Sequence, residues 1–128
     1  MKRILLVDDD PFILDIYLMQ LRRQGFAVDT ASSPAIVFEK IENNFPDLLI
    51  LDLNLDVNFP GPSQGLEVLS SLRQNIKTRD LKIIVMSNYS VQDYPELSRL
   101  SDFGILKSFL KVQISPEEVI KEVKEILK

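Results

Sequence analysis

The chain has 128 residues, the length of one ordinary domain, and its 45% hydrophobic and 27% charged residues are typical of a globular protein. It has no cysteine and no histidine, which excludes disulfides, thiolate chemistry and metal sites or general bases built on imidazole. The net charge of −4 argues against direct nucleic-acid binding. No stretch resembles a signal peptide or a membrane span, so we expect a cytoplasmic protein.

The first half of the chain predicts three strands separated by two amphipathic helices. The strands are expected at 3–7, 26–31 and 47–52. The first and third are apolar almost throughout, as in strands that are buried on both faces. Asp10 and Ser33 each precede a proline, which predicts that a helix begins after each of them. The first of these helices should cover 11–24 and end at Gly25.

The second half continues the alternation after a long connection, 53–64, that is rich in turn-forming residues. The elements expected here are a helix after Gly65, a strand over 81–86 that ends at Ser87, a strand within 104–111 and a helix after Ser115. Residues 91–100 have helical spacing but contain Pro95, so a helix there should be short or start late. Ser115-Pro116-Glu117-Glu118 has the pattern of a capping box with proline in the first turn.

Strands and helices alternate five times, which predicts a parallel sheet with helices on both faces. Right-handed crossovers then favour a doubly wound, flavodoxin-like α/β fold with strand order 2-1-3-4-5. In that order the first and third strands are neighbours. Asp8, Asp9 and Asp52 should therefore meet at the carboxyl edge of the sheet, with Ser87 alongside. Such an acidic cluster requires a cation, and ligation by oxygen alone suits Mg²⁺.

Three short motifs, each at the end of an expected strand, resemble the receiver domains of two-component response regulators. They are Leu6-Val7-Asp8-Asp9, Leu51-Asp52-Leu53-Asn54 and Val85-Met86-Ser87. The resemblance covers essentially the whole chain and implies a single receiver domain over residues 1–128. It implies a phosphoacceptor in a two-component or phosphorelay pathway. Such a domain is not an enzyme, but it assists its own phosphorylation and dephosphorylation.

The resemblance implies a role for each matching position. Asp52 corresponds to the aspartate that accepts a phosphoryl group from a phosphohistidine, and a carboxylate is a competent nucleophile toward phosphorus. Asp9 matches the acid that binds Mg²⁺ directly, and Asp8 matches the acid that usually acts through a bound water. Asp52 and the backbone carbonyl at Asn54 complete the metal site. Ser87 matches the residue whose hydroxyl turns inward to the phosphoryl group.

Receiver domains also have a lysine near the end of the fifth strand that pairs with the phosphoryl group, and it is normally followed by proline. No Lys-Pro pair occurs in this chain. Spacing from Gly104 favours Lys111, alignment from the last helix puts Val112 at that position, and Lys107 is a further candidate. We expect the lysine to be Lys111. Phe109 is the nearest candidate for the aromatic switch residue of the family.

Two further departures concern the loops around the expected site. The loop after Asp52 is about five residues longer than a usual receiver loop, which could shield the site, change kinase docking or do neither. Within it, Asp56 and Asn58 are expected to be solvated rather than to bind metal. Asn88 replaces the small residue common after the switch hydroxyl, and Tyr94 is expected to be a packing residue.

The resemblance implies a sensor histidine kinase or a histidine phosphotransfer protein as the phosphodonor. It implies a downstream partner protein at the face formed by helix four, strand five and helix five, no membrane contact, and a monomer or weak dimer. One alternative is a receiver-like interaction module that no longer switches. Another is an aspartyl-phosphate phosphohydrolase, which would require an acid at the position of Asn54. A third is a flavin-binding protein, which would require a Ser/Thr/Gly-rich loop after the first strand.

Overall fold

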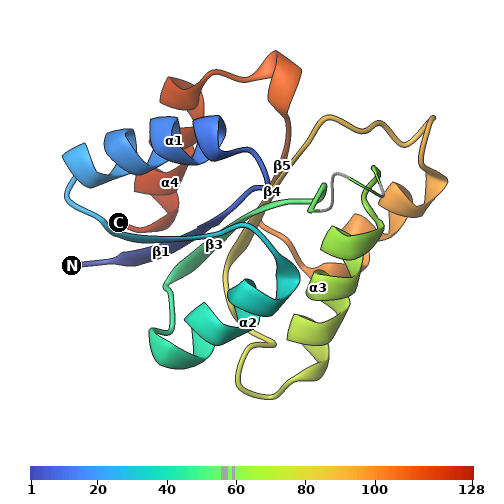
Figure 1. The fold of residues 1–128 in the computed structure, drawn as a ribbon, viewed down its shortest axis with the longest axis horizontal. Coiled ribbons are helices and arrows are strands. Elements are labelled where there is room, and N and C mark those ends of the chain that lie inside the picture. The colour runs from blue at the N-terminus through green and yellow to red at the C-terminus, as the bar shows by residue number, and fades with distance from the viewer. Residues whose placement is uncertain (56–57, 59) are drawn as a thin grey trace.

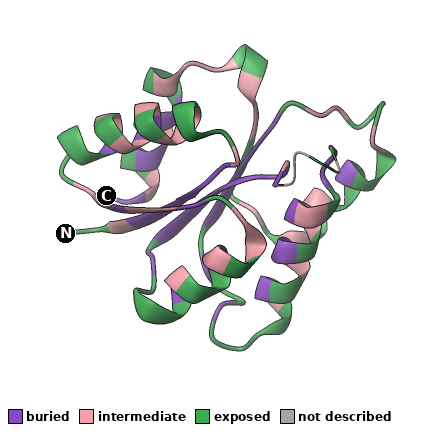
Figure 2. Cartoon of the chain, in the orientation of Figure 1, coloured by how far each residue is buried: buried purple, intermediate pink, exposed green. Residues whose placement is uncertain are grey.

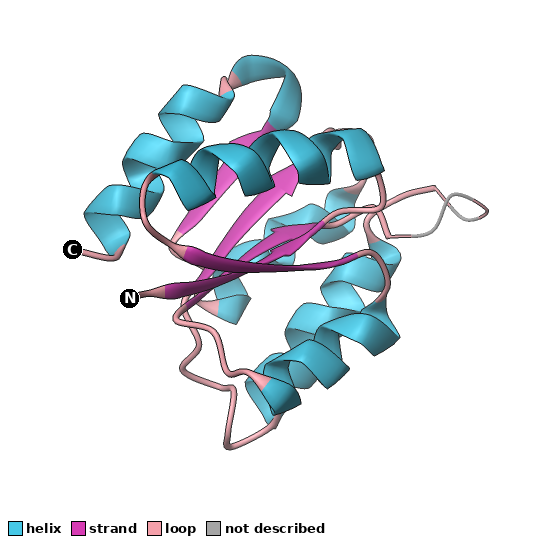
Figure 3. Cartoon of the chain, turned by 60° about the vertical axis from the view of Figure 1, so that its left-hand side comes forward, coloured by secondary structure: helices cyan, strands magenta, loops and turns pink. Residues whose placement is uncertain are grey.

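A computed structural model describes residues 1–55, 58 and 60–128 of the chain, and its centre is a five-stranded, all-parallel sheet (Figures 1 and 3). The strands are β1 (Arg3–Val7), β2 (Ala27–Ala31), β3 (Leu48–Asp52), β4 (Ile83–Ser87) and β5 (Lys107–Leu110). Their order in the sheet is β2-β1-β3-β4-β5, which confirms the predicted doubly wound topology. β1 and β3 are therefore neighbours, and their carboxyl ends lie at the same edge.

Helices cover both faces of this sheet (Figure 1). The α-helices are α1 (Pro11–Arg23), α2 (Pro34–Asn43), α3 (Ser63–Gln74) and α4 (Pro116–Ile126), and the 3₁₀ segments are η1 (Pro95–Phe103) and η2 (Lys111–Gln113). α1 and α4 pack on one face, whereas α2 and α3 pack on the other. No helix in the described part of the chain is long and apolar enough to cross a lipid bilayer.

The central strands are buried on both faces because their side chains alternate between two apolar layers (Figure 2). Leu5 and Leu49 belong to the layer under α2 and α3, whereas Ile4 and Ile50 belong to the layer under α1 and α4. All four are no more than 2% exposed. Burial of each such side chain contributes about 1.5–3 kcal/mol, so the sheet is a rigid platform for whatever its strand ends carry.

Local signals in the sequence account for most helix starts. The Asp10 side chain accepts a hydrogen bond from Phe12 N at 2.9 Å and caps α1. Ser115 and Glu118 form the predicted capping box of α4. Ser33 stands at the N-cap position of α2, but its side chain makes no capping hydrogen bond among the residues described. Proline in the first turn, rather than a cap, is the feature common to these three helices.

Three predicted strand starts were too early, at Phe26, Asp47 and Leu81, and backbone hydrogen bonds give the reason for the first and the last. Phe26 was expected in the second strand, but its amide donates to Leu21 O, so it closes the end of α1. Leu81 was expected in the fourth strand, but its amide donates to Thr78 O in the turn that precedes β4. β2 and β4 therefore begin only after these amides, which are already paired within the preceding turns.

The predicted helices after 64 also need correction. α3 begins at Ser63, so Gly65 lies inside the helix instead of preceding it. The helix over 91–100 starts late, as Pro95 predicted, but it is the 3₁₀ segment η1, which begins at Pro95. Leu97 is the single buried residue of η1, so little packing is available to favour a full α-helical turn there.

Gly65 lies against the chain that leaves β3. A Cβ atom at this position would lie 2.4 Å from Leu53 Cα and 2.8 Å from Leu53 O, and the Gly65 amide donates to the same carbonyl at 3.2 Å. These neighbours are backbone atoms that cannot move aside by changing rotamer. Glycine is therefore required for α3 to approach the carboxyl end of β3.

We predict that Gly65→Ala lowers the free energy of unfolding by about 1–3 kcal/mol, because the added methyl group forces the backbone of α3 away from Leu53. Urea unfolding followed by circular dichroism measures the change. Ser71→Ala, on the exposed side of the same helix, is the matched control and should change stability by less than about 0.5 kcal/mol. Equal stability of Gly65→Ala and the wild type would contradict the close approach.

Candidate functional site

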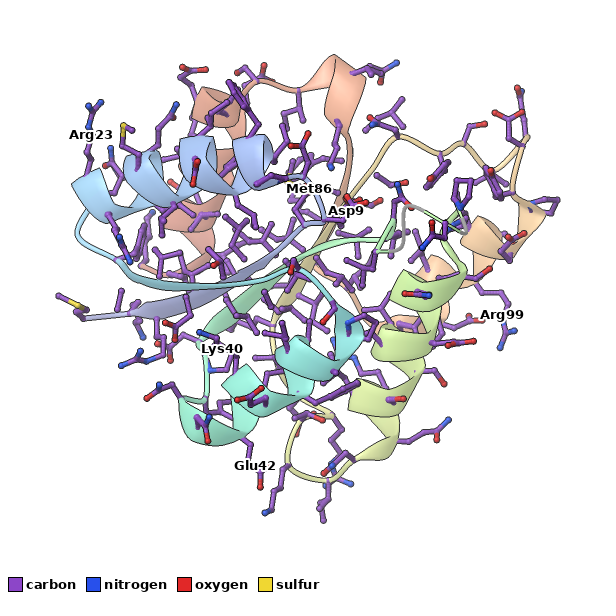
Figure 4. The ribbon with its side chains drawn as sticks, in the orientation of Figure 1. Asp9, Arg23, Lys40, Glu42, Met86 and Arg99 are labelled. Atoms are coloured by element: carbon purple, nitrogen blue, oxygen red, sulfur yellow. The ribbon has the colours of Figure 1, made fainter. Side chains whose placement is uncertain are left out.

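Three carboxylates meet at the carboxyl edge of the sheet. Asp8 directly follows β1, Asp52 ends β3, and the parallel register pairs Val7 with Leu51, which puts the two acids at the same level. Figure 4 labels Asp9 at this edge. Asp8, Asp9 and Asp52 each present an oxygen within 4.8 Å of the others. The strand order therefore brings together the acids that the sequence pattern singled out.

Lys111 places a positive charge between two of these acids. Its Nζ donates to Asp8 Oδ2 at 2.7 Å and to Asp52 Oδ2 at 2.9 Å, and its side chain is only 15% exposed. It begins η2, directly after β5, so the edge strand delivers it to the site. Lys107 lies at the other end of β5 and faces Glu122 at 3.9 Å, while Val112 is 78% exposed. Of the three candidate positions, Lys111 is the one in contact with the acids.

Backbone amides orient the remaining carboxylate oxygens. Asp10 N donates to Asp8 Oδ1 at 2.9 Å, and Asn54 N donates to Asp52 Oδ1 at 3.2 Å. Both acids are thus held from two sides, by an amide and by Lys111. The Asn54 side chain has a buried Oδ1 without a hydrogen-bond partner among the residues described. The carboxylate oxygens of Asp8, Asp9 and Asp52 fit a hard cation such as Mg²⁺.

Burial and mutual repulsion govern the charges of the site. Burial, and then the negative charge of Asp8, raises the pKa of Asp52 to about 7, and the Lys111 charge offsets only part of this. Burial and Asp8 likewise raise the pKa of Asp9. Burial alone would lower the pKa of Lys111, but attraction to Asp52 and Asp8 outweighs it, and the net shift is upward. The site holds more negative charge than one lysine can balance, which favours a bound cation.

Ser87 ends β4 on the strand next to Asp52, and it is buried. Its Oγ accepts a hydrogen bond from Tyr89 N at 2.9 Å, and the described contacts include no hydrogen bond from Ser87 to the acids. Asn88, the next residue, is exposed. Phe109 on β5 pairs in register with Met86 and packs against the layer under α1 and α4.

Sequence reasoning missed one residue beside the site, Tyr89. Its phenol oxygen accepts a hydrogen bond from Gly61 N at 2.9 Å, and its ring meets Tyr94 edge-on, with centroids 4.7 Å apart. Tyr94 is a packing residue, as predicted. No sequence pattern predicts a hydrogen bond between a phenol and a backbone amide 28 residues away. Asp56, expected to be solvated, lies outside the described residues.

Comparison with known proteins agrees with this geometry. The sequence model of the family described as "Response regulator receiver domain" matches residues 4–124. The alkaline phosphatase synthesis transcriptional regulatory protein PhoP of Bacillus subtilis is 32% identical over 127 residues, which cover 99% of this chain and 49% of PhoP. This chain spans about half the length of the curated relatives that it matches end to end.

Solved structures show the same fold. A CheY-like response regulator receiver domain protein from Methanospirillum hungatei is similar with a TM-score of 0.80 and 28% identity, over 98% of this chain and 92% of that chain. The response regulator protein TrrA from Thermotoga maritima, solved in complex with Mg²⁺-BeF, has a TM-score of 0.76 and 33% identity, over 98% and 99% of the two chains. The predicted resemblance and the flavodoxin-like fold are confirmed.

The raised pKa of Asp52 predicts that ionising this acid costs stability. The folded state keeps the proton up to a pH of about 7, whereas the unfolded chain loses it near 4. The protonated Asp52 therefore contributes stability at low pH, and this stability is lost as the pH rises between those values. Asp52→Asn removes the effect. In metal-free buffer, its stability relative to wild type should increase by about 2 kcal/mol between pH 5 and pH 8.

Urea unfolding at the two pH values, with EDTA present, measures this difference. Asp10→Asn is the matched control, because the exposed Asp10 caps α1 and asparagine caps equally well, so its effect should not depend on pH. A stability difference for Asp52→Asn that stays constant from pH 5 to pH 8 would contradict the electrostatic account.

Proposed function

The chain belongs to the response regulator receiver domain family, and on that basis we propose that it is a phosphoacceptor domain that uses Asp52 in a two-component or phosphorelay pathway. The observation that carries the proposal is the bridge from Lys111 to Asp8 and Asp52, with Asp9 beside them. This arrangement combines a nucleophile, a fixed cation and a place for a metal. We propose residues 1–128 as one receiver domain, and a cytoplasmic location stays a prediction.

The proposed chemistry is the transfer of a phosphoryl group from a histidine nitrogen of the donor to an oxygen of Asp52. An oxygen of Asp52 attacks phosphorus and forms a P–O bond, while the P–N bond of a phosphohistidine breaks and its electron pair stays on the imidazole. Lys111 already contacts Asp52 at 2.9 Å. In the product it would instead pair with a negatively charged oxygen of the transferred phosphoryl group. Amides and strand ends hold the carboxylate in position, so the site contributes orientation and charge stabilisation.

Asp8, Asp9 and Asp52 are the residues that would hold Mg²⁺, with Asn54 completing the site. A bound Mg²⁺ supplies positive charge that offsets the charge of the phosphoryl group. The fit rests on the cluster itself, in which three acids lie close together and Lys111 contacts only two of them, Asp8 and Asp52. The TrrA structure with Mg²⁺-BeF supports a similar arrangement here.

Ser87 is the proposed switch residue. Its hydroxyl would turn from Tyr89 N toward the phosphoryl group on Asp52, which changes the loop between β4 and η1. The surface formed by η1, β5 and α4 is the proposed docking face for a downstream partner, and exposed Leu106 and Val112 flank β5 there. A sensor histidine kinase or a histidine phosphotransfer protein is the proposed donor.

We predict that acetyl phosphate with Mg²⁺ adds one phosphoryl group to the wild-type chain and none to Asp52→Asn, because only the wild type offers the buried nucleophile. Intact mass spectrometry measures the adduct. Asp10→Asn, which replaces the exposed capping acid next to the cluster, should be phosphorylated like the wild type. Adducts on Asp52→Asn would contradict the assignment, and a folded wild type without any adduct would favour the non-switching interaction module.

A second prediction separates the two lysines. Lys111→Met should slow phosphorylation by acetyl phosphate by about tenfold or more, since it removes the cation that contacts Asp52. Lys107→Met removes a half-exposed lysine whose partner is Glu122, and it should react at the wild-type rate. The time course of adduct formation provides the comparison. The reverse order of effects would assign the role to Lys107.

A further inference from the structure

Tyr89 connects two loops that leave neighbouring strands. Its backbone amide donates to Ser87 Oγ at 2.9 Å, so it is tied to the end of β4. Its phenol oxygen accepts from Gly61 N at 2.9 Å, so it also holds the connection between β3 and α3. One residue thus links the proposed switch hydroxyl to the long loop that follows Asp52.

We call the described residues Pro60–Pro62 the strap. Gly61 and Pro62 are buried, and Gly61 has φ of +132°, a conformation that favours glycine. A Cβ atom on Gly61 would lie 3.4 Å from Tyr94 Cε1, so the strap packs against the Tyr94 ring as well. The T-shaped contact between the Tyr89 and Tyr94 rings holds the two rings against each other. At Gly61 the strap is held by the hydrogen bond to Tyr89 and by packing on Tyr94, while Pro62 O accepts from Leu66 N at 3.0 Å and ties the end of the strap to α3.

The Tyr89 phenol also lies within electrostatic reach of the acidic cluster. Burial raises the pKa of Tyr89, and the negative charges of Asp52 and Asp9 add to this rise. The residue that holds the strap is therefore also bonded to the end of β4, at the side of the site.

We propose that Tyr89 is a positioning residue that couples the Ser87 hydroxyl to the strap, so that the strap undocks when Ser87 turns toward a phosphoryl group. The proposal rests on the phosphorylation of Asp52 proposed above. When Ser87 Oγ turns away, Tyr89 N loses its acceptor and the turn that positions the phenol opens. Gly61 N then loses its partner, and the strap becomes a second surface that differs between the two states.

Amide hydrogen exchange at Gly61, measured by NMR on the full chain, tests the coupling. In the wild type the Gly61 amide should be protected, and Mg²⁺ with beryllofluoride should speed its exchange by about fivefold or more, the equivalent of one hydrogen bond. Tyr89→Phe keeps the ring but removes the acceptor, so exchange should already be fast without the phosphoryl analogue. Tyr94→Phe is the matched control, because no hydrogen bond of its hydroxyl occurs among the described residues, and it should exchange like the wild type.

The outcomes separate this inference from the proposed function. If Mg²⁺ and beryllofluoride shift the signals of Asp52 and Ser87 while Gly61 exchange stays slow, the phosphoacceptor role stands and the coupling is wrong. If no signal near Asp52 shifts, the proposed function itself fails. Slow Gly61 exchange in folded Tyr89→Phe, with urea unfolding as the check on folding, also overturns the coupling.

Discussion

The repulsion between buried carboxylates at one edge of the sheet is the constraint on which the rest of the structure depends. Asp8 and Asp52 are only 3% and 4% exposed, so water screens them poorly. A single lysine bridges them, and the pKa of Asp52 still rises to about 7. The fold tolerates this cost because the strands below are packed on both faces, and the unbalanced charge is what makes the edge attractive to a cation.

The structure separates rigid elements, the buried strands, from a more adaptable segment, the chain that follows Ser87. Strands β3 and β4, buried throughout, and β1, buried except at Arg3, fix the acids and Ser87. The segment that follows Ser87 has few buried residues, Leu97 in η1 among them. Local opening is least costly where little apolar surface is lost. The acids thus lie on the most stable elements, and the proposed switch residue Ser87 lies at the boundary between a buried strand and a less stable segment.

The sequence predicted what local patterns determine and missed what depends on distant contacts. The alternation of strands and helices predicted the sheet order, and that order predicted the meeting of Asp8, Asp9 and Asp52, because topology decides which strand ends are neighbours. The choice among lysines stayed open, because β5 is short and partly exposed and Lys111 meets partners 103 and 59 residues away. The bond between Tyr89 and Gly61 had no signal at all, and the 3₁₀ geometry of η1 reflects weak packing that no motif encodes.

The energies involved in the proposed switch are small, which suits a reversible signal. Turning Ser87 inward gives up its hydrogen bond from Tyr89 N, worth about 1 kcal/mol, and under the coupling inferred above the bond from Gly61 N is lost as well. A hydrogen bond to a charged phosphoryl oxygen contributes about 1.5–3 kcal/mol in return. The difference is about 1 kcal/mol or less, so phosphorylation would shift populations by about fivefold at most through this hydroxyl alone. The tether to Tyr89 therefore limits the strength of the switch. A larger response requires the second change in the site, the movement of Lys111 from Asp52 to the phosphoryl group.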